Sequence, residues 1–295
     1  MDKDKKIIIC GPPNSGKTTI VNVFFKKANP LKLLKNSLEP TRGINSEQFS
    51  LFSSNLGIFD LAGQENKDWF TKDKDIFEHS DIIMCVFDIN NSLKSIVSFI
   101  TKILKIKQDS HTLSKCKIIT FLHKIDLANR SYISQKHRAV SKFFESRYPD
   151  LEFDFYLTSI TRRYFYNTFN IILEILNLLF QKELIPISKR QFEFLKTELN
   201  LILKIDPSVK YTIETLSEKI RLNKNVLNTH LKRLEKLGFL TFLNDKEVVC
   251  FTERCQFFKR GFLREIHKIE EISRNKETKL FYTLGELNNI PVDKL

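Results

Sequence analysis

The loop at residues 11–18 (GPPNSGKT) holds the first residues whose types and spacing suit chemistry. It satisfies GxxxxGK[ST] and lies between an apolar run and an amphipathic run, the strand-to-helix setting in which this pattern binds phosphate. Its backbone N–H groups turn toward phosphate oxygens, Lys17 reaches the terminal phosphates, and Thr18 ligates Mg²⁺. A chance glycine-rich turn is the alternative. The expected phosphate contacts are Asn14, Ser15, Gly16, Lys17, Thr18 and Thr19.

A second apolar run, 56–64 (LGIFDLAGQ), ends in an acidic residue. At this distance from a phosphate loop, Asp60 stands where a carboxylate holds Mg²⁺. The Gly63 N–H group is placed to sense a terminal phosphate, and Gln64 to orient an attacking water. Gln64 is therefore a candidate catalytic residue, together with Lys17.

A polar, turn-rich segment, 39–45 (EPTRGIN), separates these two motifs. Thr41 is the candidate whose hydroxyl closes over Mg²⁺ and the terminal phosphate, then lets go after hydrolysis. An ordinary loop hydroxyl is the alternative reading of this residue. We expect the metal ligands to be Thr18, Thr41 and Asp60, and we count Thr41 among the catalytic residues.

Two short motifs predict a base site: His123-Lys124-Ile125-Asp126, and Thr158-Ser159-Ile160. Each follows an apolar strand-like run, and open α/β sheets bind ligands at the carboxyl ends of their strands. A carboxylate at Asp126 accepts from N1–H and the exocyclic amine of guanine, while adenine offers no such donor pair. Lys124 covers the ring face and Ser159 with its neighbours donates to O6, so the expected ligand is GTP or GDP.

The elements that must position these residues follow from alternating short apolar and longer amphipathic runs, which predict a mostly parallel sheet with helices on both faces. Apolar residues recur at helical spacing in the run 164–181, which closes this domain. The expected strands are 6–10, 47–51, 56–59, 82–87, 117–122 and 153–157, and the expected helices are 17–27, 93–106, 136–147 and 164–181.

These five segments, in this order, resemble the Ras-like small GTPases over about 60% of the chain. His123 in the HKxD motif and the Thr-Ser-Ile triplet are similar to the Rag/Gtr group, and the segment around Thr41 is similar to the Arf form of switch I. The resemblance implies a P-loop NTPase fold, Mg²⁺ as cofactor and slow GTP hydrolysis. It also implies GTPase-activating and exchange proteins as partners, with an effector or a roadblock-type protein as further candidates.

The C-terminal part has a different pattern, a helix-turn-helix candidate followed by a hairpin, which resembles a small α+β winged-helix domain. The expected divisions are a GTPase domain at 1–183, a linker at 184–190, the winged-helix-like domain at 191–261 and a helical extension at 262–295. Winged helices serve as protein docking modules or bind DNA. The plausible DNA contacts are Asn225, Asn228, Thr229, Lys232 and Arg233.

Composition is that of a folded protein of 295 residues, with 42% hydrophobic residues and a net charge of +13. The charge is spread along the chain, whereas a nucleic-acid footprint concentrates it on one domain or face. No segment has the pattern of a signal peptide, a membrane span or a lipid anchor, and the five cysteines have no paired spacing. These observations predict a cytoplasmic protein without an intrinsic membrane anchor.

The leading hypothesis is a GTPase switch that signals its nucleotide state to protein partners. A GTP-gated DNA-binding transcription regulator is the alternative, and a scaffold that binds nucleotide statically is a third reading.

Overall fold

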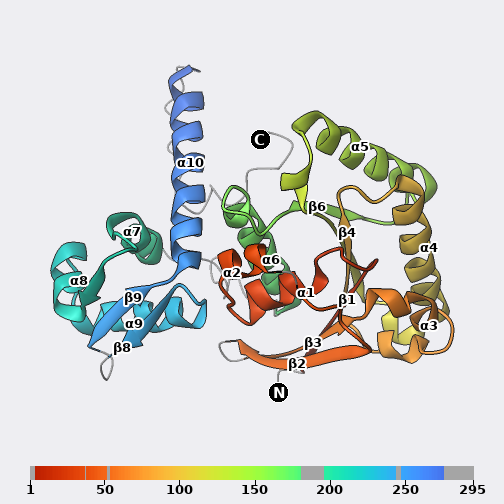
Figure 1. Ribbon diagram of the computed structural model, residues 1–295, viewed down its shortest axis with the longest axis horizontal. Coiled ribbons are helices and arrows are strands. Elements are labelled where there is room, and N and C mark those ends of the chain that lie inside the picture. The colour runs from red at the N-terminus through yellow and green to blue at the C-terminus, as the bar shows by residue number, and fades with distance from the viewer. Residues whose placement is uncertain (1–3, 37, 52–53, 181–195, 244–246, 276–295) are drawn as a thin grey trace. The chain divides into compact units, whose positions relative to one another are not determined.

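The computed structural model describes residues 4–36, 38–51, 54–180, 196–243 and 247–275 (Figure 1). Contacts along the chain group it into two compact units. The first takes in most described residues up to Thr161. The second takes in Asn29–Leu31, the segment Arg162–Asn177 and the described residues that follow in the C-terminal part. The expected linker at 184–190, the hairpin turn at 244–246 and the extension beyond 275 lie outside the described residues.

A six-stranded sheet forms the centre of the first unit, in the order β2-β3-β1-β4-β5-β6. Every neighbouring pair is parallel except β2 with β3, which is antiparallel. The strands are β1 (Lys5–Cys10), β2 (Ile44–Leu51), β3 (Ser54–Leu61), β4 (Ile82–Asp88), β5 (Lys117–His123) and β6 (Asp154–Thr158).

The central strands are continuous apolar runs because helices cover both faces of the sheet. Ile7, Ile8 and Ile9 of β1 are all fully buried, as are residues 83–87 of β4. Side chains of a strand alternate between faces, so a run without polar residues has no solvent-facing side. This rigid centre fixes the loops that follow β1, β4 and β5.

Helices of the first unit lie on both sides of the sheet, with α4 and α5 together on one side and α1 on the other (Figure 1). Ser92 caps α4, accepting from the Ser95 N–H group at 3.1 Å. The helical segments, including 3₁₀ and π turns (η), are α1 (Lys17–Ile20), η1 (Val21–Phe25), α2 (Pro30–Lys35), η2 (Gly63–Glu65), α3 (Asn66–Trp69), η3 (Lys74–Phe77), α4 (Leu93–Asp109), η4 (His111–Leu113), η5 (Ile125–Leu127) and α5 (Arg130–Arg147).

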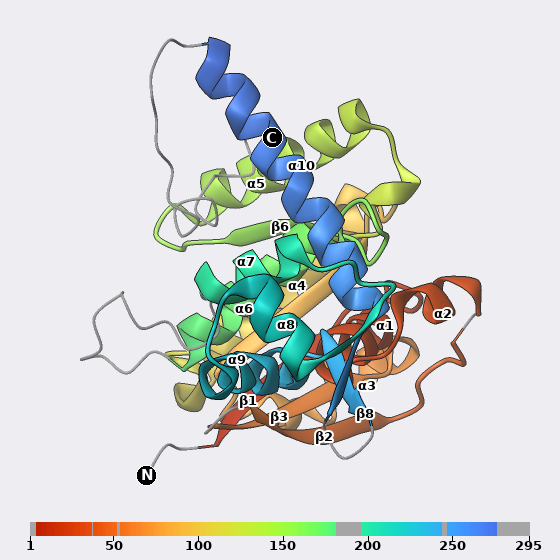
Figure 2. The ribbon, with the colours of Figure 1, turned by 90° about the vertical axis from the view of Figure 1, so that its left-hand side faces the viewer.

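The second unit combines helices with a three-stranded antiparallel sheet of order β7-β9-β8. Its described elements run helix, helix, strand, helix, helix, hairpin, helix, and the long last helix is drawn in blue in Figure 2. The elements are α6 (Phe165–Leu179), α7 (Lys196–Lys204), β7 (Lys210–Thr212), α8 (Ile213–Ile220), α9 (Lys224–Lys236), β8 (Leu240–Leu243), β9 (Val248–Phe251) and α10 (Glu253–Asn275).

Aromatic rings join α6 to α10 within the second unit. Phe165 meets Phe257 with ring centroids 5.7 Å apart, and Tyr166 meets Phe258 at 4.9 Å. Edge-to-face contacts of this kind add to the stabilisation that buried area provides. The helix that closes the phosphate-binding part of the sequence therefore packs with the C-terminal elements.

The expected mostly parallel sheet with helices on both faces is confirmed. Two helices begin earlier than their apolar pattern indicated. The expected helix 136–147 begins at Arg130, because Asn129 caps it by accepting from the Tyr132 N–H group at 2.9 Å. The described part of the helical extension expected from 262 belongs to α10, which begins at Glu253 and crosses the boundary expected after Gly261.

The patterns also missed α2 and the short strand β7, and the helix after the phosphate loop ends as a π turn. Among the described residues, no helix is both long and apolar enough to cross a membrane.

Candidate nucleotide-binding site

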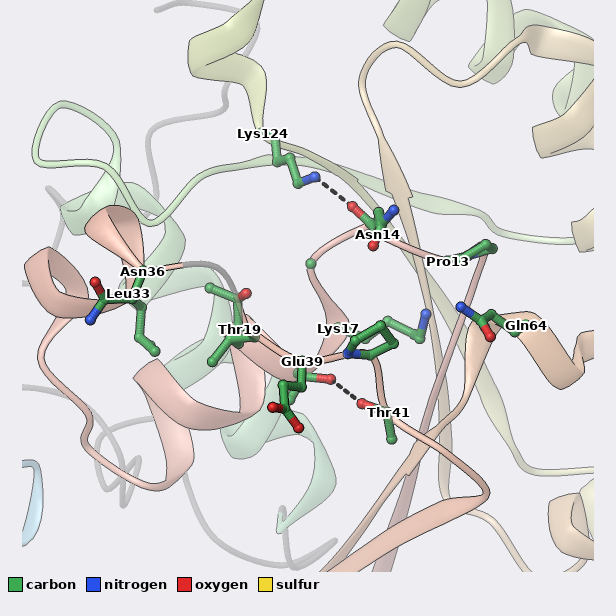
Figure 3. A pocket seen from close by; sticks show the side chains of 15 residues that line it. Pro13, Asn14, Lys17, Thr19, Leu33, Asn36, Glu39, Thr41, Gln64 and Lys124 are labelled. Carbon is green, nitrogen blue, oxygen red and sulfur yellow. Dashed lines mark hydrogen bonds between the residues drawn. The ribbon is translucent and has the colours of Figure 1, made fainter.

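A cavity of about 330 Å³ opens beside the loop between β1 and α1 (Figure 3). This loop follows β1 where its neighbours are β3 on one side and β4 on the other, which is where open α/β sheets bind ligands. The cavity is lined by Pro13, Asn14, Gly16, Lys17, Thr18, Thr19, Leu33, Asn36, Leu38, Glu39, Pro40, Thr41, Gly63, Gln64 and Lys124.

Lys17 lies in this cavity with its ammonium group turned onto the loop backbone. Nζ donates to the carbonyl oxygens of Gly11 at 3.0 Å and Pro12 at 2.8 Å. Burial lowers the pKa of Lys17, while the negative charge of Asp60 opposes that shift. A buried cation held by neutral carbonyls is well placed to bind an anion such as a phosphate.

Three oxygen-bearing side chains from three separate segments converge next to Lys17. Thr18 Oγ1 donates to Asp60 Oδ2 at 2.6 Å and lies 2.8 Å from Thr41 Oγ1. Thr18 lies in the first turn of α1, Asp60 lies near the end of β3, and Thr41 comes from the segment before β2. The sequence predicted these three as one metal site, and the fold brings their oxygens together.

Asp60 is fully buried, and burial raises its pKa despite the Thr18 hydrogen bond and the charge of Lys17. Its Oδ1 is buried and has no hydrogen-bond partner among the described residues. An unpaired carboxylate oxygen is costly unless something satisfies it. Since Mg²⁺ prefers oxygen ligands and retains waters, this set of two hydroxyls and one carboxylate fits the cation.

The two motifs assigned to the base also meet. Ser159 Oγ donates to Asp126 Oδ1 at 2.5 Å, and the Thr161 N–H group donates to Ser159 Oγ at 3.0 Å. Ile160 is buried, so it can offer a ligand only its backbone. The carboxylate expected to read guanine is thus held by the neighbouring loop.

Lys124 joins the base motif to the phosphate loop. Its Nζ donates to the Asn14 carbonyl oxygen, as Figure 3 shows, and lies 3.0 Å from Asp88 Oδ2. Asp88 is a site residue that the motif analysis missed, although its place at the end of β4 is a usable signal. Leu33, Asn36 and Leu38 were also missed, since they lie on and after α2, which no pattern indicated.

His123 is buried between the two parts of the site. Its Nδ1 shares a 2.9 Å hydrogen bond with Thr158 Oγ1, and its ring lies where a Cβ on Gly16 would be, 2.6 Å from Cδ2. Burial, helped by the charge of Lys124, lowers the pKa of His123 to about 3. The imidazole is therefore neutral and packs the base motif onto the phosphate loop.

The remaining expected residues lie in or beside the cavity. Asn14, Thr19, Gly63 and Gln64 line it, and Gln64 lies near Pro13 and Lys17 in Figure 3. Ser15 is buried, and its hydroxyl has no partner among the described residues. The two base residues Asp126 and Ser159 do not line this cavity.

The depressed pKa of His123 makes stability depend on pH. Below about pH 6.5, His123 binds a proton in the unfolded protein but stays neutral in the folded protein. The free energy of unfolding therefore decreases as the pH falls from 6.5 toward 3. Between pH 7 and pH 5 this loss is about 2 kcal/mol. In His123→Asn, the decrease in the free energy of unfolding between pH 7 and pH 5 should be smaller than in the wild type by about 2 kcal/mol. Urea unfolding at both pH values measures it.

Because the two proteins share every other residue, the difference between them isolates position 123. His123→Gln serves as a second variant if the asparagine does not fold. An equal pH dependence in wild type and variant would show that His123 is not buried as a neutral ring.

The chain is similar in sequence to several known proteins. The chain is 28% identical to ADP-ribosylation factor-like protein 5 of Caenorhabditis elegans over 43% of this chain and 63% of that protein. It is 28% identical to ADP-ribosylation factor-like protein 6 of Danio rerio over 32% of this chain and 48% of that protein. The chain thus spans about half to two thirds of the length of these curated relatives.

A solved structure, the Arl6 small GTPase of Trypanosoma brucei with a bound nucleotide analogue, is 20% identical, with a TM-score of 0.40, covering 53% of this chain and 87% of that one. The conserved region of Gtr1/RagA G proteins matches residues 6–185, which is more than half of the chain. The chain therefore belongs to the Gtr1/RagA family of G proteins, a family of GTP hydrolases.

Proposed function

We propose that this protein is a Mg²⁺-dependent GTPase switch that binds GTP or GDP, hydrolyses GTP slowly and signals its nucleotide state to protein partners. The observation that carries the proposal is the meeting of Thr18, Asp60 and Thr41 beside Lys17, at 2.6 and 2.8 Å. Two of these side chains sit on fixed elements, whereas Thr41 comes from a loop. Such a cluster can exist in one nucleotide state and open in the other.

Each chemical role falls to a residue of this site. The Lys17 ammonium binds the terminal phosphates, and Thr18, Thr41 and Asp60 hold Mg²⁺. When bound, Mg²⁺ neutralises phosphate charge that develops during hydrolysis. Gln64 lines the cavity and orients the attacking water. The loops that carry Thr41 and Gln64 then change with the loss of the terminal phosphate.

Slow hydrolysis follows from the charges around the cavity. Among the described residues that line it, the cations are Lys17 and Lys124, and there is no arginine. Related enzymes gain up to about 10⁵-fold when a partner inserts an arginine. We therefore propose that a GTPase-activating protein supplies this charge, and that an exchange protein reloads the site.

Guanine selectivity is assigned to Asp126. Asp126→Asn replaces an acceptor by a donor, so guanine affinity should fall by at least about 100-fold, since two hydrogen bonds to a charged group are worth about 3 kcal/mol or more. The measurement is competition of GDP, ATP and xanthosine diphosphate against fluorescent GDP.

Xanthine offers a carbonyl where guanine has its amine, so the variant should gain affinity for xanthosine diphosphate, which controls for misfolding. The wild type should resist competition by ATP. Equal displacement of GDP by ATP, or unchanged guanine affinity in the variant, would contradict the base assignment.

For the second unit we propose a winged-helix module that docks a protein partner. Its order of elements and its antiparallel sheet match the winged-helix plan. The structure argues against a DNA role for Arg233, because its Nε lies 3.0 Å from the fully buried Glu198 carboxylate, to which His230 is also close. DNA binding through Asn225, Asn228, Thr229 and Lys232 remains the alternative.

Arg233 and its exposed neighbour Lys232 form a matched pair of variants. Arg233→Ala should lower the free energy of unfolding by about 3 kcal/mol, because it removes the cation from a buried carboxylate. Lys232→Ala should change it by less than about 0.5 kcal/mol. Chemical denaturation of both variants checks this, and equal small effects would contradict a structural role for Arg233.

A further inference from the structure

The segment that carries Gln64 is tied to the rest of the site on both sides. Glu65 Oε1 accepts from the Gly43 N–H group at 2.9 Å, and the Ala62 N–H group donates to the Gly43 carbonyl at 3.0 Å. Gly43 follows Thr41 by two residues, just before β2. Both polar groups of this glycine are therefore held by residues that flank Gln64.

Asn66 makes the second connection. Its Nδ2 donates to the Gly11 carbonyl at 3.0 Å and to the Gly63 carbonyl at 2.6 Å, which uses both amide protons. Gly11 opens the phosphate loop and Gly63 precedes Gln64. One side chain thus joins the phosphate loop to the segment that carries the candidate catalytic glutamine.

The same segment lies tightly against the phosphate loop. A Cβ on Gly63 would come within 2.5 Å of Pro13 N and 2.8 Å of Lys17 Nζ, so only a glycine fits there. The buried indole of Trp69 donates from Nε1 to the Ala62 carbonyl at 3.0 Å, which anchors the start of the segment. Gln64 itself is exposed and faces the cavity between fixed neighbours.

We propose that Glu65 and Asn66 form a brace, a pair of positioning residues that holds Gln64 in place for GTP hydrolysis. The inference rests on the proposed function, because it needs Gln64 to act on the attacking water. Neither side chain lines the cavity. The brace therefore acts on the geometry of hydrolysis and leaves the contacts that retain GDP intact.

The charge and size of the two side chains allow selective tests. Asn66→Asp keeps the shape but sets carboxylate oxygens against two carbonyl oxygens. Glu65→Ala removes the acceptor, whereas Glu65→Gln retains an oxygen for the Gly43 N–H group. Lys67→Ala changes an exposed residue of the same helix and is the control.

Single-turnover GTP hydrolysis should fall about tenfold in Asn66→Asp and in Glu65→Ala, which corresponds to about 1.4 kcal/mol. Dissociation of fluorescent GDP should change by less than about twofold in both. Glu65→Gln and Lys67→Ala should hydrolyse GTP at close to the wild-type rate. Asn66→Ala replaces Asn66→Asp if the latter does not fold.

Gln64→Leu separates failure of the brace from failure of the proposed function. Wild-type hydrolysis in both brace variants, with slow hydrolysis in Gln64→Leu, overturns the brace alone. Unchanged hydrolysis in Gln64→Leu removes the catalytic role of Gln64 and the brace with it. A proportional rise in GDP dissociation in the brace variants would show a general role in folding the loop and would also overturn the proposal.

Discussion

The hydroxyl of Thr18 is the point through which the nucleotide site is assembled. It bonds to Asp60 at 2.6 Å and to Thr41 at 2.8 Å, and so links the first turn of α1, the end of β3 and the loop before β2. Burial raises the pKa of Asp60, and this hydroxyl, together with the charges of Lys17 and Lys26, opposes that shift. Without the Thr18 hydroxyl, the buried Asp60 carboxylate would lose a hydrogen bond that stabilises its charged form.

This arrangement depends on the sheet beneath it. Strands β1 and β3 are parallel neighbours with Ile9 paired to Asp60, so the phosphate loop and the acidic residue emerge at the same edge. Strands β4 and β5 pair Asp88 with His123, which brings Asp88 close to Lys124. The site is therefore a consequence of register, since a shift of one residue would turn each side chain to the opposite face.

Much of this could be predicted because the motifs lie at strand ends. A phosphate loop such as 11–18 joins the end of a strand to the start of a helix. An acidic residue at the end of a parallel neighbouring strand therefore lies at the same edge of the sheet as that loop. The brace could not be predicted, because Glu65 and Asn66 have ordinary side chains, and their partners Gly43 and Gly11 lie far away in sequence. Helix α2 could not be predicted either, because its leucines Leu31 and Leu34 are exposed and do not form a buried apolar face.

The limits of the first domain were hardest to read from the pattern. Apolar spacing in α6 predicts one buried face, as for a helix that closes a domain. That expected face consists of Phe165, Phe169, Ile172, Ile175, Leu176 and Leu179. The structure buries most of the helix, including Tyr166, Ile171 and Leu173 outside that face. A helix apolar on most sides is covered by more than one neighbour, and its aromatic residues pack on α10. The boundary expected at 183 stays a prediction.

We propose that the Thr18, Thr41 and Asp60 oxygens form a magnesium site that retains guanine nucleotide. The most direct measurement is the dissociation rate of fluorescent GTP from the wild type and from Thr18→Val, in excess Mg²⁺ and after chelation. Chelation of Mg²⁺ should speed GTP release from the wild type by more than about tenfold, which corresponds to a loss of about 1.4 kcal/mol of binding free energy or more. It should have little effect on GTP release from Thr18→Val. Equal rates with and without Mg²⁺ in the wild type would contradict the claim.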